Sequence, residues 1–419
     1  MKKLLVKNIG LLATPEGKSA HRGEEQGKIK FLKDAWVLVE DGIIASVGTG
    51  AVPAVEGAEV VDAEGHLVTP GLVDAHTHLI FGGWRQNELG LKLHGASYLD
   101  IQNAGGGIQS TTNATRQASE QELAAKASKA LDEMMGFGTT TVEAKSGYGL
   151  ATEHELKALE VIKDLNDHHR MDLVATFMGA HLVPAEYKSN REEYVRLVCE
   201  EMMPRVKEQG IAKFCDVFCE ADTFTVEESR QVLEAGLKYG LRPKIHADEI
   251  EAIGGSQLAG EIGAISAEHL IVCPPEGIAS MAKGGVIACL LPATSFNLGA
   301  VFAPARDMVK AGVPVAMATD FNPGSCPCLN MQFVINLGCL KYKLTPEEVL
   351  TARSTAPRRS TLPTRSALSK RASWATLSSG TRPTSTTSAT ALAAILQKPS
   401  SSAARSCERT VEGEHDGSD

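Results

Sequence analysis

Four residues in three separate segments of this 419-residue chain could together bind one metal ion. His76 and His78 stand two positions apart in the apolar run LVDAHTH, so on a strand both imidazoles point to the same side. His246 in RPKIHADE and Asp320 in PVAMATD add a third nitrogen and a carboxylate oxygen. This donor set suits Zn²⁺ or iron (Fe²⁺ or Fe³⁺) and leaves a coordination position for water. Such an ion lowers the pKa of its water toward neutrality and so creates a nucleophile for hydrolysis.

These residues close short apolar runs that recur along the chain, each followed by a helical pattern. Eight such runs lie at residues 72–78, 139–145, 172–181, 211–219, 242–249, 264–270, 285–292 and 314–320. Eight strand-helix units predict a parallel (β/α)8 barrel, with a doubly wound open sheet as the alternative. A barrel places its chemistry at the C-terminal ends of the strands. The polar residues that end these runs fit that rule: His76, His78, Lys145, His181, His246, Glu249, His269 and Asp320.

The elements around the runs divide the chain. Residues 1–68 alternate β-branched segments with turns, and Asp41-Gly42 between two apolar runs predicts a hairpin, so we expect a small β-rich unit there. Residues 69–352 carry the barrel pattern. Between the runs, amphipathic segments at 119–135, 152–166 and 225–239 predict helices, with Ser119 and Thr225 as N-caps.

Composition narrows the class of function. The formal net charge is −9, so the chain presents no global positive field to a nucleic acid or an anionic membrane. It also contains no apolar stretch of the roughly 18 residues that a membrane span needs. Nine cysteines in no regular framework are typical of reduced thiols. We therefore expect a cytoplasmic globular protein that binds a small molecule rather than nucleic acid or membrane.

Residues 353–419 form a different kind of sequence. They are rich in Ser, Thr, Ala and Arg and contain no acidic residue before Glu408. Taken as written, this is a disordered low-complexity tail. Alternatively, codons for SWATLSSGT (373–381) read one base earlier can encode KLGDLVIWD, which has the pattern of a strand where the written peptide does not. Our hypothesis is that the tail is a frameshifted remnant that begins near residue 352. Resequencing this part of the gene tests it, because an intact frame would refute it.

Several motifs identify a family. PGLVDAHTH, IHADE and ATDFNPGS resemble the first-, fifth- and eighth-strand motifs of the amidohydrolase superfamily, whose fold is a (β/α)8 barrel with a small β-sandwich built from both chain ends. The longer motifs GWRQNELGLKLHGASYLDIQNAGGGI, EAKSGYGL, GAHLVP and FCDVFCE are similar to the imidazolonepropionase family within it. The resemblance implies hydrolysis of the ring amide of 4-imidazolone-5-propanoate to N-formimino-L-glutamate, a step of histidine degradation, by a homodimer. The recovered frame of the tail also resembles that family's C-terminal strands.

The resemblance also assigns roles to residues. Six positions match family contacts to substrate: Arg85, Tyr148, His181, Asn322, Gly324 and Ser325. A fork-shaped arginine suits the substrate's carboxylate. Glu249, also a substrate contact, would position the water or move its proton, and His269 would polarise the carbonyl or stabilise the oxyanion. Asp320 would ligate the metal and could pass a proton to the leaving nitrogen. On sequence alone these proton-transfer roles are interchangeable.

Two further interpretations stay open. A metal-dependent aminohydrolase of a purine or pyrimidine shares the barrel and the metal ligands, but a neutral nucleobase gives no reason for Arg85 and Tyr148. A non-catalytic relative would keep the barrel without the metal. Lys145 we interpret as structural or adjacent to substrate, and we expect one metal ion per chain rather than two.

Overall fold

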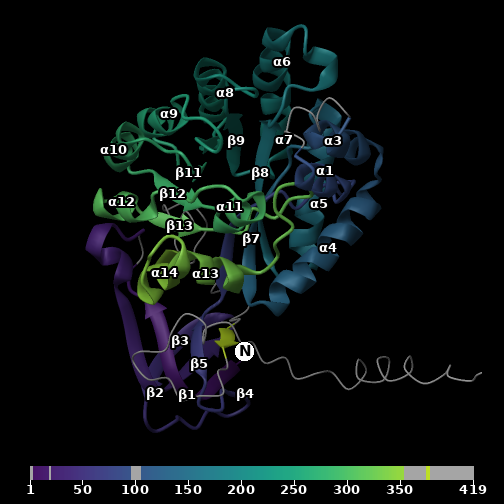
Figure 1. Cartoon of the computed structure of the whole chain (residues 1–419). Coiled ribbons are helices and arrows are strands. Elements are labelled where there is room, and N and C mark those ends of the chain that lie inside the picture. Colours follow the sequence, from purple (N-terminus) through teal and green to yellow (C-terminus); the bar gives the residue numbers. More distant parts are fainter. Residues whose placement is uncertain (1–2, 18–19, 96–104, 353–373, 378–419) are drawn as a thin grey trace, which may run out of the picture.

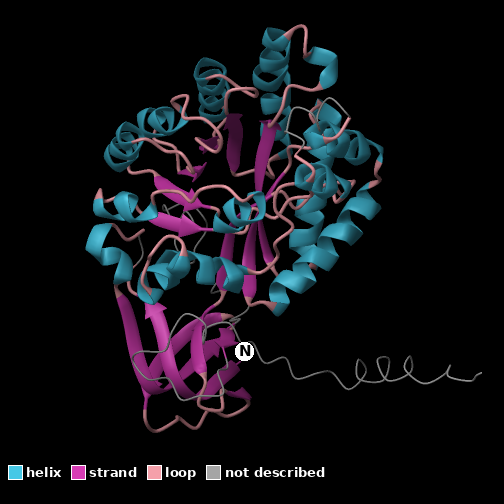
Figure 2. Cartoon of the chain, viewed as in Figure 1, coloured by secondary structure: helices cyan, strands magenta, loops and turns pink. Residues whose placement is uncertain are grey.

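Two sheets organise the computed structural model, which describes residues 3–17, 20–95, 105–352 and 374–377. One sheet is small and carries the N-terminal residues. The other has eight strands and is surrounded by helices (Figure 1). Figure 2 shows the small sheet as a separate layer of strands beneath the helix-covered part of the chain. The small sheet contains the N-terminal strands, and the eight-stranded sheet contains the strands between residues 72 and 317.

The small sheet has the order β14-β5-β1-β2-β3, and β4 also pairs with β1. Its core is formed by side chains such as Ile9, Val37 and Val68, all essentially unexposed. The predicted hairpin joins β2 to β3, and positive φ angles of 47° at Asp41 and 81° at Gly42 make its two-residue turn. The strands are β1 (Lys3–Pro15), β2 (Ile29–Glu40), β3 (Ile43–Thr49), β4 (Glu59–Asp62), β5 (Leu67–Pro70) and β14 (Trp374–Leu377).

The tail contributes β14, which runs antiparallel to β5. We expected no strand from the written residues of this segment, and that expectation is wrong for Trp374–Leu377. The unpaired edge of β5 accepts these four residues through backbone hydrogen bonds, for which side-chain pattern matters little. The other tail residues, 353–373 and 378–419, lie outside the described residues.

The large sheet runs in chain order from β6 to β13, and every neighbouring pair is parallel. Its two edges meet: Thr77 bridges Phe321, and the His78 amide donates to the Phe321 carbonyl at 2.8 Å. The sheet is therefore a (β/α)8 barrel, not an open doubly wound sheet. Its strands match the eight predicted runs: β6 (Leu72–Thr77), β7 (Thr139–Lys145), β8 (Asp172–Ala180), β9 (Phe214–Cys219), β10 (Arg242–Ala247), β11 (Ser266–His269), β12 (Ile287–Leu290) and β13 (Val315–Met317).

Helices cover the outside of the barrel (Figure 1). Ser119 and Thr225 are N-caps as predicted, each in a capping box with the glutamate three residues later. None of the helices in the described parts of the chain is long and apolar enough to cross a membrane. The helices are α1 (Asn87–Leu93), α3 (Gly107–Gln117), α4 (Glu120–Gly136), α5 (Thr152–His168), α6 (Arg191–Leu197), α7 (Met203–Gln209), α8 (Val226–Lys238), α9 (Gly255–Ile262), α10 (Pro275–Gly284), α11 (Pro292–Leu298), α12 (Ala305–Lys310), α13 (Met331–Leu340) and α14 (Pro346–Ala352).

Candidate metal centre and active site

The four predicted metal ligands converge at the C-terminal mouth of the barrel. Nε2 of His76 lies 3.4 Å and Nε2 of His78 lies 3.6 Å from Oδ1 of Asp320. Nε2 of His246 lies 3.3 Å from Nε2 of His78. All four side chains are buried. Strands β6 and β10 and the segment after β13 thus aim three nitrogens and one oxygen at a common point.

This donor set fits a metal ion. Within the described residues, Nε2 of His76 and Oδ1 of Asp320 are buried and have no hydrogen-bond partner. Buried polar atoms without partners are costly, so these two atoms are suited to a ligand. Burial, reinforced by neighbouring histidines and Lys145, holds the pKa values of His76 and His78 well below the usual range. Both imidazoles are therefore neutral at neutral pH, as metal ligation requires.

His269 lies closer to the ligands than the sequence indicated. Ligand atoms of His76, His246 and His269 lie within 4.8 Å of one another, as do those of His76, His78 and Asp320. The two groups share His76. Nε2 of His269 also lies 3.6 Å from Oε2 of Glu249. His269 is thus placed either to complete the metal coordination or to act beside it.

Local backbone conformations present two of these residues at the mouth. The φ angles of His269 and Asp320 are +68° and +57°, in the left-handed region that non-glycine residues rarely adopt. Each angle turns the chain away from its strand. Asp320 is held there because its amide donates to the His76 carbonyl at 3.0 Å and its Oδ2 accepts from Thr294 Oγ1 at 2.7 Å. The turn exposes Oδ1 toward the histidines.

Glu249, two residues past β10, lies beside His269 with 13% of its side chain exposed. Burial raises its pKa to about 8, with further contributions from Asp320 and Glu220. Glu220 also fixes the loop: its Oε2 accepts from the backbone amides of Glu249 at 3.1 Å and Ile250 at 2.9 Å. The sequence reasoning missed Glu220, which ends the run FCDVFCE at the mouth of the neighbouring strand.

Arg85 is a buried cation with unused donors. Its side chain is 7% exposed, and Nε and Nη1 have no hydrogen-bond partner in the part of the chain that the structure describes. Glu88 is its ion-pair partner, at 3.5 Å from Nε. The guanidinium lies against Gly324, where a Cβ atom would come within 1.4 Å of Nη2. The arginine fork and the loop after β13 therefore occupy adjoining space.

Tyr148 and His181 line the side of the site near His78. The His181 ring stacks on His78 with centroids 4.8 Å apart and planes inclined by 18°. Tyr148 lies 5.8 Å from the His78 ring and 5.1 Å from the His181 ring. Burial lowers the pKa of His181 to about 3, so the ring is neutral, and its Nδ1 bonds the Gly147 carbonyl at 2.9 Å.

Asn322 and Ser325 shape the loop after Asp320. Oδ1 of Asn322 accepts from the amides of Gly324 at 2.9 Å and Ser325 at 2.7 Å, and its Nδ2 donates to the Asp320 carbonyl and to Ser325 Oγ, both at 2.8 Å. These side chains bond to their own loop. The structure thus brings Arg85, Tyr148, His181 and this loop to the barrel mouth together with the metal ligands.

Two carboxylates bond to two of the predicted metal ligands, and neither carboxylate was predicted from the sequence. Glu268 accepts from Nδ1 of His76, and Asp216 accepts from Nδ1 of His246 at 3.0 Å. An acidic residue inside an apolar run, as in FCDVFC and SAEHL, is the signal that could have found them. Lys145, interpreted as structural or adjacent to substrate, is fully buried between Glu143 and Asp216. This burial and pairing favour the structural interpretation of Lys145.

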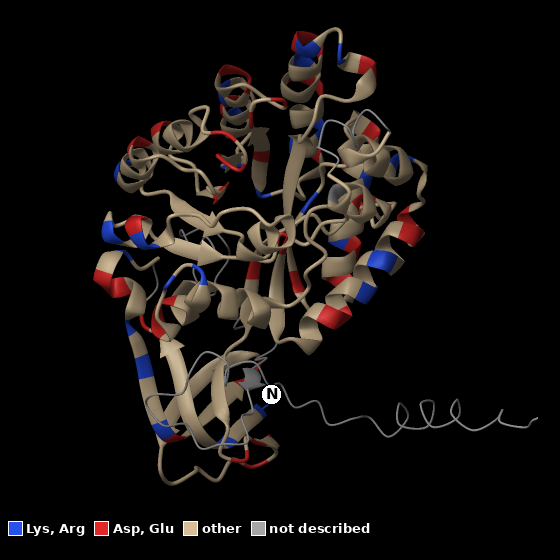
Figure 3. Cartoon of the chain, in the orientation of Figure 1, with Lys and Arg blue, Asp and Glu red and all other residues tan. Residues whose placement is uncertain are grey.

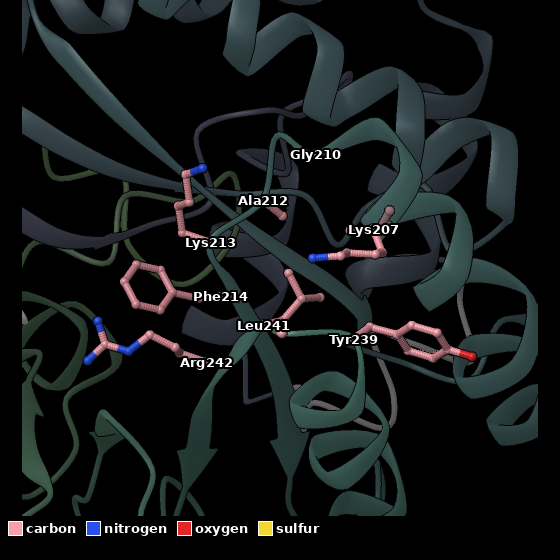
Figure 4. A pocket seen from close by; sticks show the side chains of 10 residues that line it. Lys207, Gly210, Ala212, Lys213, Phe214, Tyr239, Leu241 and Arg242 are labelled. Carbon is pink, nitrogen blue, oxygen red and sulfur yellow. The ribbon is translucent and has the colours of Figure 1, made fainter. Parts of the chain in front are cut away.

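A separate hollow of about 260 Å³ lies at the opposite end of β9 and β10 (Figure 4). Lys207, Lys213 and Arg242 line it, but Figure 4 shows the side chains of Lys213 and Arg242 pointing away from that of Lys207. Since its cations do not converge and it lies at the N-terminal ends of the strands, it forms no part of the candidate site.

Comparisons with known proteins agree with this geometry. The model of the amidohydrolase family matches residues 67–361. An imidazolonepropionase of Alkaliphilus metalliredigens is 52% identical over 358 residues, covering 84% of this chain and 85% of the relative, and one from a Geobacillus species is 50% identical over 360 residues with the same coverage. In fold, the chain is similar to a triazine hydrolase variant (TM-score 0.67, 17% identity, 93% of this chain and 90% of that one). It is also similar to a guanine deaminase of C. acetobutylicum (TM-score 0.58, 18% identity, 83% and 84%).

Proposed function

We propose that this chain, which belongs to the amidohydrolase family and to the imidazolonepropionases within it, hydrolyses the ring amide of 4-imidazolone-5-propanoate to N-formimino-L-glutamate. The observation that carries the proposal is Arg85, whose buried guanidinium pairs with Glu88 through Nε at 3.5 Å and keeps Nη1 without a hydrogen-bond partner among the described residues. A buried cation with open donors suits an anionic ligand, and the propanoate carboxylate is one. The identity of about 50% to imidazolonepropionases supports the same substrate.

One metal ion would be held by His76, His78, His246 and Asp320, as Zn²⁺ or as iron. When bound, the ion supplies Lewis-acid activation of a water molecule. A count of one is supported by the two overlapping donor groups, because both depend on His76 and its single free nitrogen can ligate only one ion.

Glu249 and His269 would handle the proton and the developing charge. A carboxyl whose pKa is about 8 can both take and give a proton near neutral pH, so Glu249 would accept the proton of the attacking water and pass it to the ring nitrogen. His269, with its Nδ1 free of partners in the described structure, would hydrogen-bond the carbonyl oxygen as it gains charge. Asp320 is the alternative donor to the leaving nitrogen, since burial raises its pKa to about 6.

The remaining site residues would orient the ring. Arg85 would pair with the carboxylate, and Tyr148 and His181 would contact the ring on the side of His78. Gly324 would leave room for the arginine. Asn322 and Ser325 would present the loop after Asp320 to the substrate, which their bonds within that loop support.

We also propose that the protein is a cytoplasmic homodimer. Each chain would consist of three segments: residues 1–68, which start the small β domain, the barrel at 69–352 and the tail at 353–419. All eight cysteines within the described regions are free thiols, which supports the compartment. The dimer follows from the resemblance, and light scattering on the purified chain tests it.

For the tail, we keep the frameshift hypothesis. The family model ends at residue 361 and the similarity to the Alkaliphilus relative covers 84% of the chain. Resequencing the gene across codon 352 decides it: a frame that continues as written would refute the hypothesis.

The experiment that tests the function is turnover of 4-imidazolone-5-propanoate, followed as loss of ring absorbance with and without a chelator. Guanine is the control substrate, with ammonia release as its readout. We expect chelator-sensitive loss of the imidazolone and no ammonia from guanine. Ammonia release would instead support the aminohydrolase interpretation. If neither substrate reacts, a frame-restored chain separates a defective tail from a wrong assignment.

A further inference from the structure

Five charged side chains are buried inside the barrel directly beneath the metal position. They come from four of the five consecutive strands β7 to β11, with β8 contributing none, and none is more than 6% exposed. Figure 3 shows charged residues on strands within the ring of helices as well as on the outer surface. A barrel interior is normally filled by branched apolar side chains. The cluster consists of Glu143 and Lys145 on β7, Asp216 on β9, Lys244 on β10 and Glu268 on β11.

The cluster is connected by ion pairs. Nζ of Lys145 lies 2.8 Å from both Glu143 Oε1 and Asp216 Oδ2. Nζ of Lys244 lies 3.3 Å from both Glu143 Oε1 and Glu268 Oε1. Glu143 therefore joins the two lysines, and each lysine holds one further carboxylate. Three carboxylates and two ammonium groups leave one negative charge below the metal position.

Asp216 and Glu268 divide their two oxygens in the same way. Asp216 accepts a hydrogen bond from Lys145 through Oδ2 and one from Nδ1 of His246 through Oδ1. Glu268 forms an ion pair with Lys244 through Oε1 and accepts a hydrogen bond from Nδ1 of His76 through Oε2. A carboxylate accepts only, so each imidazole must carry its proton on Nδ1. This leaves the lone pair on Nε2, the atom that faces the metal position.

We propose that these five residues are positioning residues of the metal centre, in which Lys145 and Lys244 anchor Asp216 and Glu268 so that His246 and His76 are fixed, before any ion binds, in the tautomer that ligates through Nε2. The inference rests on the proposed metal-dependent function. In this proposal the lysines affect metal binding by holding the carboxylates in place, and the carboxylates affect it by fixing the tautomer of the histidines.

The surroundings of the cluster support this order of action. Burial alone would lower the pKa of Lys145, but the carboxylates of Asp216, Glu143 and Glu268 raise it above its usual value. The lysine thus stays charged. A buried ion cluster of this kind adds little stability over an apolar core of equal volume, whereas loss of one member leaves an uncompensated charge. His78 is the internal contrast, because its Nδ1 has no partner in the described part of the chain.

The test measures Zn²⁺ affinity of the full-length chain by competition with a chelator. Asp216→Asn and Glu268→Gln keep the shape of the side chains, yet an amide can rotate and donate to Nδ1, which would move the imidazole proton to Nε2. We expect each variant to bind Zn²⁺ roughly 10- to 100-fold more weakly. Nitrogen NMR of histidine-labelled, metal-free chain should show one histidine fewer protonated at Nδ1 in each variant.

Lys145→Met tests the connection. It should weaken Zn²⁺ binding, and the double variant Lys145→Met/Asp216→Asn should bind no more weakly than Asp216→Asn alone, because the lysine acts through that carboxylate. Additive losses would overturn the order of action. If Lys145→Met fails to fold, the two isosteric amide variants still decide the proposal.

The matched control is Glu348→Gln on α14. This change disrupts the two hydrogen bonds that Arg306 of α12 donates to the Glu348 carboxylate, both at 2.7 Å. It should lower the melting temperature without changing Zn²⁺ affinity. Parental affinity and unchanged tautomers in Asp216→Asn and Glu268→Gln, or an equal loss in Glu348→Gln, would overturn the proposal. Neither readout uses substrate, so absence of imidazolone turnover would count against the proposed function alone.

Discussion

The two halves of the candidate site leave opposite kinds of atom open. In the metal half, His76 and His246 have their Nδ1 atoms bonded to carboxylates, and the open atoms that face the metal position, His76 Nε2 and Asp320 Oδ1, are acceptors. In the substrate half, the open atoms are donors on the cation Arg85. Open acceptors call for a cation, and open donors call for an anion. The comparison teaches that the atoms left without partners identify the ligand better than the fold does, since one fold serves many reactions.

We expect the largest loss of activity when the metal half of the site is disrupted. His246→Ala removes the nitrogen that lies 3.3 Å from Nε2 of His78, so kcat/KM should fall by roughly 10³-fold or more because water activation is lost. Metal content of the purified variant should fall in parallel. His168→Ala is the control, because that histidine is exposed at the end of α5 and should leave both values unchanged.

The next effect separates the halves. Arg85→Met removes the charge-assisted hydrogen bonds to a carboxylate, so KM should rise roughly 100-fold while Zn²⁺ affinity stays at the parental value. An imidazolone without the propanoate group should react equally slowly with parent and variant. Equal losses of substrate and metal binding in Arg85→Met would break the division into two halves.

A smaller loss is expected from crowding the arginine. In Gly324→Ala the new Cβ atom would lie 1.4 Å from Nη2 of Arg85, so the guanidinium must move. KM should rise by more than roughly tenfold but less than in Arg85→Met, because misplacement is less severe than removal. Gly90→Ala on α1 has open space around its Cβ and serves as the control. An unchanged KM in Gly324→Ala would mean that the fork does not contact substrate there.

The smallest effect is the pH dependence of metal binding. Burial raises the pKa of Asp320 to about 6, whereas the pKa values of His76 and His78 lie well below their usual range. As pH falls through 6, Asp320 gains a proton, and this proton competes with the metal ion for the carboxylate. The histidines stay neutral in this range. Zn²⁺ affinity should therefore fall roughly tenfold from pH 7 to pH 5, with one proton displaced per ion. Release of two or more protons would place histidine titration in this range.

The sequence predicted the barrel because eight apolar runs, each followed by a helical pattern, indicate eight strand-helix units. It also predicted that the four candidate ligands meet at one end of the barrel, because His76 and His78 share one strand face and the others end strands. It did not predict Asp216 and Glu268 as partners of these histidines, since the partner of a buried carboxylate depends on which strands become neighbours. The bonds of Asn322 within its own loop depend on the φ angle at Asp320, which no residue type specifies.

The single metal centre is best tested by a Zn²⁺ titration of the metal-free chain in which bound metal and turnover of 4-imidazolone-5-propanoate are measured on the same samples. We expect bound metal and turnover to rise together and to stop at one ion per chain. A plateau of turnover at two ions, or full turnover without metal, would contradict a single metal centre built from His76, His78, His246 and Asp320.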